Sequence, residues 1–295
     1  MNSDKVKGAS ALFTSAFIYS TFGILIRQMA LMFGDSAQTA VRFGVAFVFI
    51  FILNFIRKQS INLPKKAILK ACLLGLSFGC VVLLFTISVN NTKIANSVFL
   101  LYAGSMISSL AIGTILLKEK LTTIKIVAIL IAFLGLYMYS DAILVMSVGI
   151  IAGIVSGLFD GISNAIRKTL KGFNRNAILT YQFAFSSLLA AFAMLAIGDV
   201  IIKHILPLSI LAVIIFAFLQ IGLGNLLLYG FQHFDVNVGT VILATELFFA
   251  SILGFLIFKE IPTSREILGG MLIFGASIVS TVDFKSLVSK NIKMR

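Results

Sequence analysis

Long runs of apolar residues recur along the whole chain and are separated by short polar connections. Each run has the length of a helix that crosses a bilayer, because about 20 residues at about 1.5 Å each span a hydrocarbon core of about 30 Å. The pattern therefore predicts an all-α polytopic membrane protein with ten transmembrane helices and no soluble domain. The predicted helices are 8–33, 36–56, 67–88, 94–117, 122–140, 146–168, 177–197, 207–231, 237–258 and 264–282.

Two segments share one pattern of residues, which indicates an internal duplication. Residues 95–122 superpose on residues 236–263 with a shift of 141 positions, and both segments carry a Lys-Glu pair near their end. We therefore predict two repeats of five helices each, at residues 1–142 and 143–295. Because five is an odd number, the second repeat enters the membrane from the opposite side. Inverted repeats recur in secondary transporters, whose substrate sites lie near the membrane midplane between the repeats.

Composition supports the membrane class and restricts the partners. Hydrophobic residues make up 59% of the chain and charged residues 12%, which excludes a soluble domain of this size. The net charge of +13 arises from short clusters between apolar runs, so we expect no nucleic-acid partner. Cys72 and Cys80 lie in one apolar run, which is not the pattern of a disulfide framework.

The same basic clusters predict the orientation of the chain. Lysines and arginines gather near residues 57–70, 118–125 and 167–175 and at both termini, and Arg167 is assigned to such a connection. Under the positive-inside rule these regions lie in the cytoplasm. We predict a multi-pass protein of the bacterial inner (plasma) membrane with both termini in the cytoplasm and no cleaved signal peptide.

Two carboxylates at membrane depth are the first candidates for a substrate site. Glu246 and Asp160 lie at nearly the same depth, so we expect both to reach one cavity. Glu246 either binds a cationic group or a proton, or it pairs with Arg42 or a lysine to hold the halves together. We favour function, because buried ion pairs contribute little net stability. Asp160 either binds substrate or hydrogen-bonds Asn164, one helical turn away.

Arg42 and several neutral polar residues complete the predicted substrate site. Arg42 either binds a carboxylate with two parallel hydrogen bonds, or it reaches the outer interface or pairs with Asp35. The further candidates are Tyr102, Asn164, Gln182 and Ser20. Most neutral groups of this kind only hydrogen-bond a neighbouring helix. Tyr102 is the best placed of them, because its run is the repeat equivalent of the run that holds Glu246.

Other features of the chain indicate packing or helix boundaries. The run 146–168 carries four glycines at a spacing of four, which lets a neighbouring helix approach closely. These glycines are Gly149, Gly153, Gly157 and Gly161. The Lys-Glu pairs at 118–119 and 259–260 fall at helix ends, where we expect solvated or helix-capping charges and not a site. His204 and His233 lack a second histidine at ligand spacing, so we expect no metal, no cofactor and no catalytic residues.

The two halves together resemble a known family. Each half ends in an apolar run with a Lys-Glu element, LLKEKLT at 116–122 and LIFKEIPT at 256–263. With the duplication and the ten runs, this pattern resembles the EamA-type members of the drug/metabolite transporter superfamily. Arg42 matches an arginine often found in that family's second helix, and ATEL at 244–247 resembles its Glu-Pro element in helix nine. Because Leu247 replaces the proline, we expect helix nine to lack a kink there.

The resemblance implies secondary transport of small metabolites, often export of amino acids or related compounds. Our leading hypothesis is a secondary active exporter of a small-molecule substrate such as an amino acid, working by alternating access within the lipid bilayer. Proton coupling through Glu246 is a further hypothesis. The alternative is a polyspecific drug or lipid efflux carrier, since 28 phenylalanines would suit an apolar cavity. A membrane-embedded enzyme is disfavoured, and both a monomer and a homodimer stay open.

Overall fold

The computed structural model describes residues 3–139, 147–200, 202–258, 261 and 263–281, and these residues form α-helices without strands. The helices are α1 (Ser3–Tyr19), α2 (Phe22–Ala30), α3 (Asp35–Ile56), α4 (Lys65–Asn91), α5 (Ile94–Ile115), α6 (Thr123–Tyr139), α7 (Val148–Thr169), α8 (Arg175–Ile197), α9 (Pro207–His233), α10 (Val236–Leu243), α11 (Glu246–Phe258) and α12 (Ser264–Thr281). In this part of the chain, eight helical stretches are long and apolar enough to cross a membrane, and Thr123–Met138 is a shorter apolar helix. The predicted class is confirmed, whereas the count of ten transmembrane helices stays a prediction.

Two of the predicted apolar runs are each divided into two helices. The first run forms α1 and α2, and the ninth forms α10 and α11. At each interruption a threonine hydroxyl donates to a carbonyl three residues earlier, Thr21 to Ile18 and Thr245 to Ile242, both at 2.7 Å. Such bonds compete with the helical hydrogen bonds of the backbone. We expected helix nine to lack a kink because Leu247 replaces the proline. This expectation is wrong, since the helix is interrupted at Thr245 without a proline.

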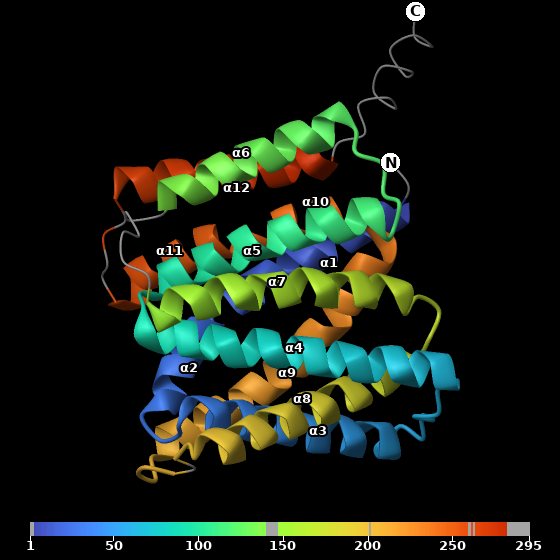
Figure 1. Cartoon of the computed structure of the whole chain (residues 1–295), viewed down its shortest axis with the longest axis vertical. Helices are drawn as coiled ribbons and strands as arrows, with labels where there is room; N and C mark the ends of the chain where they lie inside the picture. The colour runs from blue at the N-terminus through green and yellow to red at the C-terminus, as the bar shows by residue number, and fades with distance from the viewer. Residues whose placement is uncertain (1–2, 140–146, 201, 259–260, 262, 282–295) are drawn as a thin grey trace, which may run out of the picture.

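The two halves run through the bundle in opposite directions (Figure 1). Helix α1 begins and α12 ends on the right-hand side of the view, and α7 runs from left to right, against α1. At one end of the long axis α6 packs on α12, and at the other end α3 packs on α8, so both pairs join the two halves. We call the side on which α1 begins the inner end of the bundle and the opposite side the outer end.

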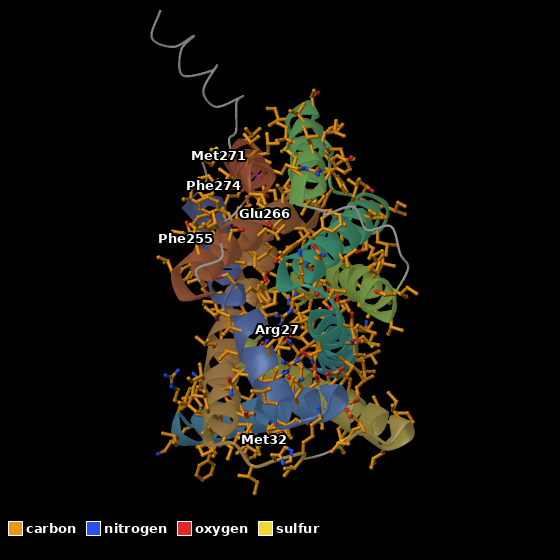
Figure 2. All side chains as sticks on the ribbon, turned by 90° about the vertical axis from the view of Figure 1, so that its left-hand side faces the viewer. Arg27, Met32, Phe255, Glu266, Met271 and Phe274 are labelled. Atoms are coloured by element: carbon orange, nitrogen blue, oxygen red, sulfur yellow. The ribbon has the colours of Figure 1, made fainter. Side chains whose placement is uncertain are left out.

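The bundle exposes apolar side chains and buries polar ones. Phe55 is 80% exposed, whereas the Arg42 side chain is 0% exposed. Figure 2 shows the bundle from the outer end, with Arg27 in the middle of the view and Phe255 and Met271 near its edge. This distribution suits a lipid surround, because hydrocarbon accepts apolar groups while polar groups need partners inside the protein.

Three of the four glycines of α7, Gly153, Gly157 and Gly161, bring its backbone against α5, and Gly149 faces the end of α4. A Cβ at Gly157 would meet the carbonyl oxygen of Leu101 and would lie 2.8 Å from the backbone nitrogen of Ser105. Gly104 of α5 faces the same contact, since a Cβ there would lie 3.1 Å from the Cα of Gly157. The predicted close approach of a neighbouring helix is confirmed.

This contact predicts an unequal response to alanine at two glycines. Gly157→Ala should lower the free energy of unfolding by about 1–3 kcal/mol, because a methyl group overpacks two backbones that cannot separate freely. Gly222 of α9 is the matched control, since a Cβ there meets nothing within 4 Å. Thermal unfolding of both purified variants in detergent measures the difference, and equal losses would contradict the close contact of α5 with α7.

Candidate functional site

A narrow, largely enclosed cavity of about 30 Å³ lies in the middle of the bundle. It has room for about two water molecules. Its polar lining consists of Tyr19 from α1, Tyr102 from α5, Asp160 from α7, Gln220 from α9 and Glu246 from α11, and its other lining residues are aliphatic or aromatic. The cavity therefore brings together three predicted site residues, Tyr102, Asp160 and Glu246, from both halves of the chain.

Tyr102 holds Glu246 across the two halves. The tyrosine hydroxyl donates to Glu246 Oε2 at 2.5 Å, and both residues are buried. Glu246 forms no ion pair within the described ranges, so the predicted alternative of pairing with Arg42 is wrong, and no described lysine pairs with it either. A buried carboxylate needs hydrogen bonds or a counter-charge. With one hydroxyl donor on one oxygen, Glu246 retains acceptor capacity for a ligand or a proton.

Asp160 begins a polar chain that runs along α7 towards the inner end. Ser105 Oγ and Asn164 Nδ2 donate to Asp160 Oδ2 at 2.6 and 2.9 Å. Arg167 donates in turn to Asn164 Oδ1. The predicted hydrogen bond between Asp160 and Asn164 is confirmed, and Asp160 nevertheless lines the cavity. The two alternatives for this residue are therefore compatible, since one oxygen atom takes both hydrogen bonds.

Arg42 lies beside the cavity, behind an aromatic ring. It donates to Thr86 Oγ1 at 2.5 Å, and its guanidinium lies 4.5 Å from the centroid of Phe216, which lines the cavity. Because Arg42 is fully buried, the prediction that it reaches the outer interface is wrong. No ion pair with Asp35 forms in the described part of the chain either. Its Nε and Nη1 lack partners among the described residues and can donate to an anion.

Arg167 is a buried arginine that the sequence prediction missed. It was assigned to a solvated connection, yet it lies in the last turn of α7 with 1% exposure. Its guanidinium lies 4.7 Å from the ring centroid of Phe78, another residue of the cavity wall. Arg167 follows Asp160 by seven positions and Asn164 by three, so all three lie on one helix face. That spacing indicates that Arg167 shares the inward face of Asp160. The prediction instead followed the positive-inside rule and assigned Arg167 to a solvated connection.

Gln182 and Ser20 do not reach the cavity lining. Gln182 lies on α8 with 1% exposure, and neither atom of its amide has a hydrogen-bond partner among the described residues. Ser20 lies at the interruption between α1 and α2, where its hydroxyl donates to the Phe17 carbonyl at 2.6 Å. By contrast, Tyr19, which precedes Ser20, and Gln220 of α9 do line the cavity. Neutral polar residues on adjacent turns of an apolar helix cannot be ranked without knowing which face is turned inward.

Four charged residues form an ionic cluster at the inner end of the bundle. Lys168 pairs with Glu119 at 2.6 Å and with Asp235 at 3.0 Å, and Lys125 pairs with Asp235 at 2.7 Å. Burial alone raises the pKa of Asp235, but its pairs with Lys125 and Lys168 outweigh burial and hold this pKa below its usual value. Of the two alternatives expected for Glu119, solvation is wrong, since its side chain is 3% exposed. It is a helix-capping charge, because it accepts hydrogen bonds from the first backbone nitrogens of α10.

Two further predictions concern residues away from the cavity. The Lys-Glu pair at 259–260 lies outside the described residues. His233 Nδ1 lies 2.9 Å from the Tyr229 carbonyl oxygen of its own helix. In the described ranges, no group of three or more histidine, cysteine or acidic side chains is arranged to hold a metal ion.

A polytopic bundle with two oppositely directed halves around a polar cavity is the architecture of secondary transporters. The sequence matches the EamA-like transporter family over residues 6–140 and 147–282, once in each half. The chain therefore belongs to the EamA-like transporter family, and the resemblance predicted from its sequence is confirmed.

Solved structures support the fold. Of the 29 chains that match, one that is described only as "Crystal structure of protein" aligns with a TM-score of 0.75 at 14% identity. The alignment covers 93% of this chain and 98% of that chain. No curated protein matches the chain.

The contact between Tyr102 and Glu246 predicts an energetic coupling between the two halves. In a double-mutant cycle of Tyr102→Phe and Glu246→Leu, we expect a coupling free energy of about 1–2 kcal/mol, because each change removes the same hydrogen bond. Thermal unfolding in detergent measures it. Tyr181→Phe serves as the control tyrosine, since its hydroxyl forms no hydrogen bond with a described residue. A coupling as small as that between Tyr181→Phe and Glu246→Leu would contradict the contact.

Proposed function

We propose that the protein is a secondary active transporter that exports a small metabolite, such as an amino acid, by alternating access. The observation that carries the proposal is the contact of Tyr102 with Glu246, which joins the two halves at the wall of a central cavity. Membership of a transporter family supports the class. In the proposed topology the halves are residues 1–142 and 143–295, and both termini lie on the cytoplasmic side of the inner membrane.

The polar groups around the cavity suit a substrate with charges of both signs. Glu246 and Asp160 provide carboxylate oxygens within the lining, which attract an ammonium group. Arg42 has two unpartnered donor nitrogens behind Phe216, which suit a carboxylate once the ring moves aside. Amino acids carry both groups. We propose that Glu246, Asp160 and Tyr102 bind the cationic part and that Arg42 binds the anionic part.

A cationic amphipathic compound is the second candidate substrate. The cavity lining contains two carboxylates but no lysine or arginine, and the aromatic rings of Phe22, Phe78 and Phe85 form much of its apolar wall. Aromatic faces attract organic cations. This composition favours drug-like cations, and it is the specific observation behind the alternative of a polyspecific efflux carrier.

The small cavity fits a closed intermediate of the proposed cycle. Ligand pockets usually measure about 300–1,000 Å³, whereas this cavity measures about 30 Å³. Binding of a metabolite therefore requires the helices around the cavity to move apart. The interruptions before α2 and α11 lie next to cavity residues and are natural places for such movement.

A thermal-shift screen distinguishes the two substrate classes. A ligand present at about 100 times its Kd should stabilise the folded protein by about 2.7 kcal/mol. We expect selective stabilisation by one chemical class among amino acids, nucleobases, sugars, organic cations and lipids. Amino acids support the leading proposal and organic cations the alternative, whereas stabilisation by none of these classes would contradict both.

Replacement of Glu246 tests proton coupling. In proteoliposomes, a pH gradient should drive substrate flux through the wild type, and Glu246→Gln should abolish this dependence because the amide takes up no proton. Counterflow of substrate without a gradient provides the control, since exchange needs binding but no net proton movement. Unchanged gradient-driven flux in the variant would rule out a coupling role for Glu246.

A further inference from the structure

Glu119 connects the two halves at the inner end of the bundle. It lies in the connection between α5 and α6, and its side chain is 3% exposed. Its Oε1 accepts hydrogen bonds from Lys168 Nζ at 2.6 Å and from the backbone nitrogen of Val236 at 2.8 Å. Its Oε2 accepts from the backbone nitrogen of Asn237 at 3.2 Å. A carboxylate of the first half thus caps the N-terminus of α10 in the second half, where negative charge is stabilising.

The local backbone is shaped to direct Glu119 into this position. Lys118 adopts a positive φ of 53°, which is unfavourable for a residue with a side chain, and the Glu119 nitrogen then donates to the Gly113 carbonyl at 2.9 Å. A Cβ at Gly113 would lie only 2.9 Å from Glu119 Oε2. The chain therefore turns back against α5, and a glycine leaves room for the carboxylate.

A polar contact between α10 and α5 lies in the stretch that separates Glu119 from the cavity. We define the inner seam as the contact of α5, α7 and α10 between Asp160 and Glu119. In it, Thr240 Oγ1 of α10 donates to Ser109 Oγ of α5 at 2.9 Å. The buried side chain of Asn237 has no hydrogen-bond partner for either amide atom among the described residues. A permanently dry contact with such a group is costly, whereas a contact that fills with water in another conformation is not.

We infer that Glu119 is a positioning residue of the transport cycle that holds the inner seam shut. The inference rests on the proposed alternating access. Glu119 closes the seam because it fixes the start of α10, and Lys168 of α7 completes the contact. When these bonds break, α10 separates from α5 and α7, and Glu246 and Asp160 become accessible from the inner end. Glu119 of the Lys-Glu element in the first half would thereby hold the inner seam closed, in addition to marking the end of a helix.

Asp199 provides a matched comparison at the outer end. It lies in the connection between α8 and α9, and its Oδ2 accepts hydrogen bonds from the backbone nitrogens of Ser36 at 2.8 Å and Ala37 at 3.4 Å. It therefore caps α3 of the first half from the second half, by the same chemistry as Glu119. It does not touch the inner seam, so its loss weakens a cap between the halves without opening that route.

The experiment measures the reactivity of a cysteine within the inner seam. Cys72 and Cys80 are first replaced by alanine, and Ser109→Cys is introduced at a position with 0% exposure. Alkylation by a membrane-permeant maleimide is followed in membranes that contain the full-length protein. We expect alkylation to be about tenfold faster in Glu119→Gln, because local opening limits the reaction of a buried group. Lys168→Met should act in the same direction, since it removes the ion pairs of Lys168 with Glu119 and Asp235 but leaves the Glu119 carboxylate at the start of α10.

Two controls separate opening of the seam from general loosening. Asp199→Asn should leave the alkylation rate of Ser109→Cys unchanged. Ser186→Cys, at a fully buried position where α8 contacts α4, should stay unreactive in every background. An unchanged rate in Glu119→Gln, or an equal increase in Asp199→Asn or at Ser186→Cys, would overturn the inference. Alkylation is read without any transported compound, so a failure of the proposed transport would be recognised separately.

Discussion

The burial of charge in a low-dielectric bundle is the constraint on which the structure depends. Hydrocarbon offers no hydrogen bonds, so every carboxylate and guanidinium inside the bundle must find its partners within the protein. Glu246 meets this need with a tyrosine from the other half, and Asp160 with a serine and an asparagine. Arg42 uses a threonine hydroxyl and an aromatic face. Neutral hydrogen-bond donors and aromatic rings therefore stabilise these three charged groups in place of counter-ions.

The same constraint explains how the two halves are joined. Small residues let α7 approach α5 so closely that backbone atoms make much of the contact. Polar bonds also join the halves, at Asp199 near the outer end, at the cavity, and at Glu119 near the inner end. Serine hydroxyls add further bonds between the halves, such as Ser186 to the Gly75 carbonyl and Ser156 to the Val81 carbonyl.

Sequence reasoning reached the fold and much of the site. Apolar runs and a shift of 141 positions were enough to predict a helical membrane protein with two related halves. Membrane depth alone selected Glu246 and Asp160, because carboxylates are rare there and their cost is high.

The depth of a residue in the membrane does not, however, predict the direction in which its side chain points. Gln182 and Gln220 are both glutamines in apolar helices, yet Gln220 lines the cavity and Gln182 does not. Arg167 and Glu119 were misread for a related reason. Both lie close to helix ends, where charge is usually solvated, and their burial depends on α10 and other helices that pack from distant parts of the chain.

One consequence follows from the hydroxyl that already occupies Glu246 Oε2. Under the proposed function, a substrate that binds this oxygen competes with the Tyr102 hydroxyl, which is held beside it. The net free energy of binding at this oxygen is then the difference between the substrate's hydrogen bond to Glu246 and that of Tyr102. Poor hydrogen-bond donors therefore bind weakly there, whatever their size. Because the phenol belongs to the opposite half of the molecule, a substrate that displaced it in the proposed cycle would also break a bond between the halves, which couples binding to their movement.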